Sequence, residues 1–173
     1  MKAMRKYISV VDGFNYGLGR IAMYGIFVLM GILLWSSYNK TFASPQLWTL
    51  EMAQFVMVGY YILGGPYALQ MGSNVRMDLF YAELTPRKKA WTDSITVMFL
   101  LIYLVILLWG GIESTLYSFK YGGERSPTAW RPYMWPVKVT MCIGIFLMLL
   151  QAVSELFKDI LFLKSGEDTR DAL

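Results

Sequence analysis

Two polar segments of the sequence carry closely spaced charged and aromatic side chains. In the first, residues 72–81 (GSNVRMDLFY), Arg76 and Asp78 alternate with apolar residues. A segment with this pattern can bury its apolar side chains at a membrane interface, while Arg76 and Asp78 bond to backbone or partner groups. The chemistry that these residues favour is a structural polar contact.

The second segment, residues 126–138 (SPTAWRPYMWPVK), combines aromatic and basic side chains with three prolines. Trp130, Arg131 and Trp135 are residue types that dominate protein contact surfaces, and Lys138 ends the segment. One interpretation is therefore a contact surface. The other is a rigid re-entry into the membrane, with Pro136 opening the next helix.

Catalytic and metal-binding residues are scarce in this chain. It has no histidine and a single cysteine, Cys142. This composition excludes His-based catalytic triads, bis-histidine haem ligation, most zinc sites and an intramolecular disulfide. A phosphate-binding glycine loop and the H-E-x-x-H motif are also missing. We expect no enzyme activity, no cofactor, no metal site and no nucleic-acid partner.

The elements that must position the two polar segments are four apolar blocks. Apolar residues make up 56% of the chain and charged residues 16%, against about 45–50% and about 25% in soluble domains. A membrane-spanning helix needs roughly 20 mostly apolar residues. The blocks predict spans at residues 19–39, 50–70, 93–113 and 137–157, and so an all-α integral membrane protein with one four-helix domain over residues 1–173.

Two alternatives to this interpretation are weaker. The helices of a soluble bundle keep a polar face, whereas residues 97–109 and 143–150 have none. The first block could be a signal peptide, but it exceeds the roughly 7–15 apolar residues of a signal core. We expect it to be retained as a helix in contact with the lipid bilayer.

The distribution of basic residues predicts the orientation of the spans. Most of the 16 Lys and Arg residues precede the first block, link the second to the third, or follow the fourth. Such residues concentrate on the cytoplasmic side of membrane proteins. Both termini are therefore predicted to be cytoplasmic, and the 126–138 segment is predicted to lie on the outer side.

The predicted spans contain no ionisable residue near mid-membrane. Glu51, Lys138 and Glu155 lie at span ends, where we expect them within reach of water. A buried charge is the usual sign of an ion or substrate path, so we expect this chain to support transport rather than perform it. The break at Gly64, Gly65 and Pro66 is either a mild kink or a place where a partner helix approaches closely.

Short motifs along the chain carry a family resemblance. Residues 48–51 read W-T-L-E, Gly59 to Tyr67 form a glycine-rich stretch, and residues 74–78 read N-V-R-M-D. With the four blocks, they resemble the small membrane subunit of tripartite ATP-independent periplasmic (TRAP) transporters, the DctQ family. Asn74 stands where many members have histidine, which argues against a protonatable role there. Residues 130–138, with Gly144 and Gln151, are similar to the branch named around mannitol, chloroaromatic compounds and 2-oxo acids.

The resemblance implies a supporting role in the bacterial inner membrane. In this family a periplasmic substrate-binding protein delivers an organic acid to a large, elevator-type, sodium-coupled membrane subunit. The small subunit enlarges the fixed scaffold of the large one, and its outer surface helps to dock the binding protein. The candidate contact residues are Glu51, Gly64, Gly65, Asn74, Arg76, Asp78, Trp130, Arg131, Trp135 and Lys138.

Two other functional classes remain as alternatives. A self-sufficient homodimeric small exporter has a similar size, but four-helix multidrug exporters carry a glutamate inside their first helix, and residues 21–34 contain no acid. A membrane-anchored redox or quinone subunit is the third candidate, and the absence of histidine argues against haem in it.

Overall fold

The computed structural model describes residues 2–42, 44, 46–72, 85–121 and 124–165. These residues form an all-helical structure with a single isolated β-bridge, between Arg125 and Tyr133. The helices are α1 (Lys2–Met23), α2 (Gly25–Phe42), α3 (Trp48–Gln70), α5 (Pro86–Lys120) and α6 (Trp135–Ser165).

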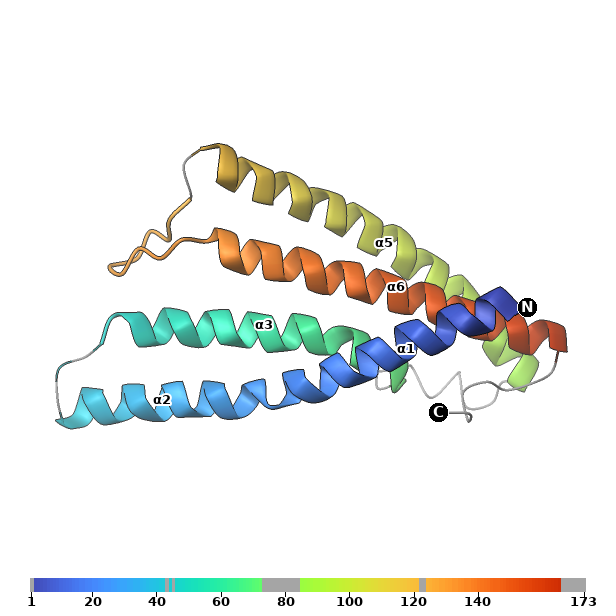
Figure 1. The fold of residues 1–173 in the computed structure, drawn as a ribbon, viewed down its shortest axis with the longest axis horizontal. Coiled ribbons are helices and arrows are strands. Elements are labelled where there is room, and N and C mark those ends of the chain that lie inside the picture. The colour runs from blue at the N-terminus through green and yellow to red at the C-terminus, as the bar shows by residue number, and fades with distance from the viewer. Residues whose placement is uncertain (1, 43, 45, 73–84, 122–123, 166–173) are drawn as a thin grey trace.

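Helices α3 and α6 form the centre of an elongated bundle (Figure 1). Helix α2 packs on α3, α5 packs on α6, and α1 crosses both α3 and α6 near one end of the molecule. The beginning of α1 and the end of α6 lie at this same end, whereas residues 124–134 lie toward the opposite one (Figure 1). The described part of the chain therefore begins and ends on one side of the bundle.

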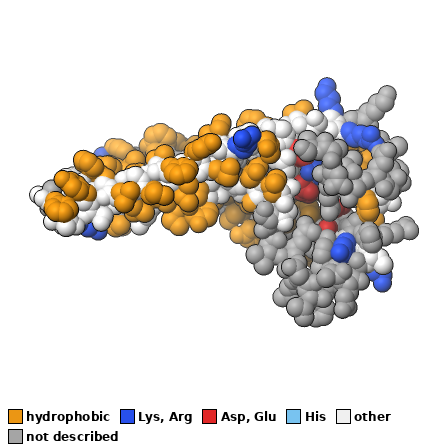
Figure 2. Space-filling model, turned by 90° about the horizontal axis from the view of Figure 1, so that it is seen from below, with side chains coloured by type: hydrophobic (Ala, Val, Ile, Leu, Met, Phe, Trp, Pro, Cys, Tyr) orange, Lys and Arg blue, Asp and Glu red, His pale blue; other side chains and the backbone are white. Residues whose placement is uncertain are grey.

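The bundle buries many polar residues and exposes many apolar ones. An apolar core joins α5 to α6 through Leu104, Ile145 and Ala152, yet many other buried residues are polar or charged. Figure 2 shows hydrophobic side chains along most of the visible face, with charged side chains gathered mainly at one end. A protein dissolved in water shows few such continuous apolar surfaces, so this exterior suits the hydrocarbon of a bilayer.

Three helical stretches of the described residues are long and apolar enough to cross a membrane: Met4–Phe42, Trp91–Lys120 and Trp135–Leu163. The first combines α1 and α2, so the helix begins well before the span predicted at residue 19. Helix α3 is not among the three, since it contains polar, glycine and tyrosine residues as well as Pro66. The count of four spans stays a prediction.

A short irregularity at Tyr24 separates α1 from α2. There the amide of Tyr24 donates to the carbonyl of Ile21 at 3.1 Å, and the amide of Phe27 donates to the carbonyl of Tyr24 at 3.0 Å. These bonds reach back three residues instead of four, which is the tighter 3₁₀ pattern. Two helical rods therefore meet at Tyr24, with α1 packed on α3 and α6 and α2 packed mainly on α3.

The contact between α3 and α6 depends on small residues. A Cβ atom placed on Gly144 would clash with Cγ2 of Ile62 and lie 3.0 Å from the carbonyl oxygen of Ile62, which is tighter than an ordinary van der Waals contact. Pro66 lacks the N–H that would bond to this carbonyl within α3. The proline and Gly144 thus meet at the same crossing, which lets the two backbones approach closely.

Candidate functional site

Residues 124–134 form a small hairpin at one end of the bundle. The amide of Ser126 donates to the carbonyl of Pro132 at 2.9 Å, and the amide of Met134 donates to the carbonyl of Glu124 at 2.9 Å. Across the hairpin, Arg125 Nη2 lies 2.6 Å from Tyr133 Oη, and its guanidinium sits 4.6 Å from the centre of the Tyr133 ring. These contacts hold residues 124–134 in the hairpin conformation.

The tip of the 124–134 hairpin presents two of the four residues of this segment that are predicted to form a contact surface. Trp130 and Arg131 are exposed there. Arg131 adopts a positive φ of 50°, a left-handed conformation that is uncommon for residues other than glycine. Strained positions of this kind gather at binding sites, where the surrounding structure holds them.

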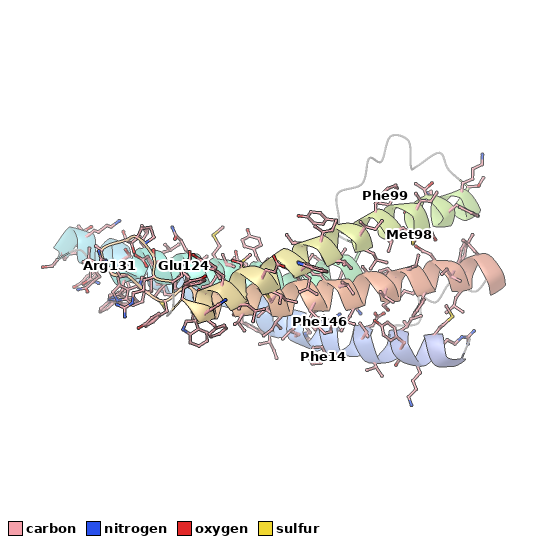
Figure 3. All side chains as sticks on the ribbon, turned by 90° about the horizontal axis from the view of Figure 1, so that it is seen from above. Phe14, Met98, Phe99, Glu124, Arg131 and Phe146 are labelled. Atoms are coloured by element: carbon pink, nitrogen blue, oxygen red, sulfur yellow. The ribbon has the colours of Figure 1, made fainter. Side chains whose placement is uncertain are left out.

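The other two predicted residues of this segment belong to the base of the hairpin. The Trp135 ring packs on that of Phe119, with 5.7 Å between centroids. Lys138 pairs with Glu124 and also lies 3.4 Å from the carbonyl oxygen of Ser114. Figure 3 shows Glu124 and Arg131 at the same end of the molecule. Because the charge of Lys138 is matched within the chain, Arg131 is the better candidate for a partner's acidic group.

Glu51 lies at the start of α3 and is only 6% exposed. This corrects the expectation that it lies within reach of water. Near Glu51, a hydrogen bond joins the start of α3 to α2: the Thr49 hydroxyl lies 3.0 Å from the Ser36 hydroxyl. One carboxylate oxygen of Glu51, Oε2, has no hydrogen-bond partner among the described residues.

The remaining predicted contact residues divide into two groups. Gly65 faces α6, where a Cβ atom placed on it would lie 2.9 Å from Met148 Sδ, while Gly64 has open space around it. The close approach expected at this break therefore occurs at Gly65, inside the chain itself. Asn74, Arg76 and Asp78 lie outside the described residues.

A buried polar cluster between α1 and α6 escaped the sequence analysis. Asp12 is completely buried and accepts hydrogen bonds from Gln151 Nε2 and Ser154 Oγ, each at 2.9 Å. Lys158, only 4% exposed, forms ion pairs with Asp12 at 2.6 Å and with Glu155 at 2.8 Å. Lys158 follows the predicted fourth span, and α1 covers it there.

The sequence does contain a weak signal for this cluster. Gln151, Ser154 and Lys158 are three and four residues apart, so they share one face of α6. Asp12 and Asn15 are three residues apart on α1 in the same way. What the sequence does not show is that these two polar faces meet.

A family model described as "Tripartite ATP-independent periplasmic transporters, DctQ component" matches residues 29–162. The chain belongs to this family. Comparison with curated proteins gave no match. The DctQ match confirms the family that the sequence motifs predicted, but it does not test the predicted branch.

Membership of the DctQ family makes the chain the small membrane subunit of a TRAP transporter. It is a component of transport machinery, not a member of an enzyme family, and it works with partner subunits. The DctQ match begins within α2 and ends within α6, so it includes the 124–134 hairpin and the α6 side of the polar cluster. Asp12 and the rest of α1 lie before it.

Proposed function

We propose that this DctQ-family chain is a fixed scaffold in the bacterial inner membrane that holds the large TRAP subunit. The family match is the observation that carries this proposal. The apolar exterior supports it, because a scaffold subunit must offer apolar surface to lipid and to another membrane subunit at once. The scaffold spans the membrane four times, with α3 as a span and with both termini in the cytoplasm.

The position of α3 supports a span despite its lower apolar content. Helices α2 and α6 pack on it from different sides, and most of its residues after Phe55 are partly covered. A membrane helix covered by protein needs less apolar surface than one that faces lipid. The basic residues of the chain support the orientation, since they gather where the positive-inside rule puts the cytoplasm.

The transporter that this subunit serves imports an organic acid, driven by sodium. The substrate and sodium sites belong to the large subunit, and the small one contributes scaffold. The 130–138 segment favours the branch that includes mannitol, chloroaromatic compounds and 2-oxo acids. At the outer side, the tip of the 124–134 hairpin helps to dock the periplasmic binding protein through Trp130 and Arg131, a pair of residue types common in binding hot spots.

Co-purification tests the scaffold role. The tagged chain is expressed with the large membrane subunit encoded beside it, extracted in mild detergent and analysed for mass. We expect a complex with one copy of each chain, because the exposed apolar faces of a lone subunit remain unpaired. An unrelated membrane protein with the same tag is the control. A stable homodimer that leaves the large subunit behind would contradict the proposal and favour the exporter alternative.

A further inference from the structure

The side of α1 that packs into the bundle contains polar as well as apolar residues. Asp12 and Asn15 are buried against α6, while Val10, Phe14 and Ile21 are exposed. Phe14 is 59% exposed (Figure 3). Ile8 is buried on the same side, and the charged Arg5 and Lys6 are exposed on the other. Apolar burial and polar contacts therefore both contribute to the orientation of α1.

The polar contacts between α1 and α6 form a connected network. Gln151 is at its centre: its amide nitrogen donates to Asp12 Oδ1 at 2.9 Å and to Glu155 Oε1 at 3.1 Å, and its carbonyl oxygen accepts from Asn15 Nδ2 at 2.7 Å. Lys158 bridges the same two carboxylates, Asp12 and Glu155. An amide and an ammonium thus hold the two acids together in a place that water barely reaches.

This network admits only one rotation of α1. Residues 12 and 14 differ by about 200° around a helix with 3.6 residues per turn, so bringing Phe14 inward would carry Asp12 out. Lys158 would then be left among apolar groups with one partner fewer, and Gln151 would lose two of its bonds. Buried charges tolerate such a loss poorly, and fixing a register is the best-attested use of a buried polar pair.

We propose that Asp12, Gln151 and Lys158 form a polar lock that sets the rotation of α1 in the scaffold. The lock keeps the apolar stripe of Val10, Phe14 and Ile21 turned outward. The 3₁₀ irregularity at Tyr24 separates α1 from α2, which packs mainly on α3. The contacts of the lock join residues of this one chain.

Thiol reactivity measures the rotation of α1 directly, because the chain has a single native cysteine. In a Cys142→Ala background, Phe14→Cys reports the outward face and Ile8→Cys the buried one. The full chain in membrane vesicles is treated with methyl methanethiosulfonate, a small neutral reagent. We expect position 14 to react at least tenfold faster than position 8. Equal rates would overturn the proposal at once.

Variants of the lock then test its cause. Lys158→Met leaves Asp12 buried without its cation, and we expect the ratio of the two rates to fall toward one. Asp12→Asn together with Lys158→Met removes both charges, keeps the shape of the acid and should restore most of the ratio. Lys6→Met, on the exposed side of α1, is the matched control and should change nothing. An unchanged ratio in Lys158→Met would overturn the lock, as would a double variant no better than the single one.

If Lys158→Met does not accumulate in the membrane, Asp12→Asn alone replaces it. This variant retains a side chain that can still bond to Gln151, so the helix contact persists while the ion pair is lost. We expect the ratio of the two rates, position 14 over position 8, to fall below its value in the native chain but to stay above one. A ratio equal to the native value would show that the charge pairing does not set the rotation.

Discussion

At the scale of single residues, a few small or polar side chains decide how the helices meet. Gly144 lets α3 and α6 approach at the carbonyl of Ile62, and Gly65 makes room for Met148. Bilayer lipid is as apolar as leucine, so apolar area contributes little to helix association in a membrane. Close backbone approach and polar pairing take its place.

Gly144→Ala is expected to destabilise this crossing. The new Cβ would clash with Cγ2 of Ile62 and lie 3.0 Å from the Ile62 carbonyl oxygen, so the Ile62 side chain or the helix backbones must shift. Overpacking of this kind costs about 1–3 kcal/mol, which thermal melting of the detergent-solubilised chain would register as a lower midpoint.

Gly64→Ala is the matched control for that prediction. No atom lies within 4 Å of the Cβ position at Gly64, and alanine is favoured over glycine in a helix by about 1 kcal/mol. We expect the midpoint to stay level or to rise. If Gly64→Ala lowers the melting midpoint as much as Gly144→Ala does, close packing at the crossing of α3 and α6 is not the cause of the destabilisation.

At the scale of elements, the 124–134 hairpin is a pre-organised connection. Its two cross-strand backbone bonds and the Arg125–Tyr133 contact fix it before any partner arrives. Pre-organisation reduces the entropy lost on binding. Trp130 and Arg131 are exposed at the tip of the hairpin, where Arg131 has a positive φ.

Substitutions at Arg131 separate its charge from its backbone conformation. Arg131→Gly removes the charge but suits a φ of 50°, whereas Arg131→Lys keeps the charge. We expect the binding protein to dock about tenfold more weakly to the Gly variant, a difference of about 1.4 kcal/mol, and nearly normally to the Lys variant. Titration of the reconstituted complex with the binding protein measures both. Normal docking of Arg131→Gly would exclude Arg131 as a docking cation.

At the scale of the whole molecule, polarity is arranged for a membrane. The exterior is largely apolar, and the interior contains ion pairs such as that of Asp12 with Lys158. The start of α1 and the end of α6 share one end of the bundle, opposite the hairpin (Figure 1). The two ends therefore face opposite sides of the bilayer if the bundle spans it.

Labelling from the two sides tests this topology. In the Cys142→Ala background, Ala129→Cys lies in the exposed tip of the hairpin and Lys6→Cys on the exposed side of α1. A membrane-impermeant maleimide applied to spheroplasts should label position 129 and spare position 6, because basic residues favour the cytoplasmic side. Inverted vesicles should give the opposite pattern. Labelling of position 6 from outside would reverse the orientation.

The sequence by itself determined the membrane class, the helical architecture and the family. Long apolar blocks are a property of local composition, and motifs such as W-T-L-E at residues 48–51 need no folded contact to be read. It also singled out residues 126–138, because prolines and aromatic residues are concentrated there, although it did not predict that they take part in a hairpin. The branch, the four spans and the orientation stay predictions.

Only the tertiary structure decided which polar residues are buried. Asp12 and Lys158 are 146 positions apart, and each alone resembles an ordinary charge on the surface of a helix. Their pairing depends on how α1 crosses α6, which no local pattern specifies. The same holds for Glu51, expected near water and found buried, and for Gly65, whose neighbour is Met148 of its own chain. Burial is a property of how helices pack, so it appeared only when the helices were placed together.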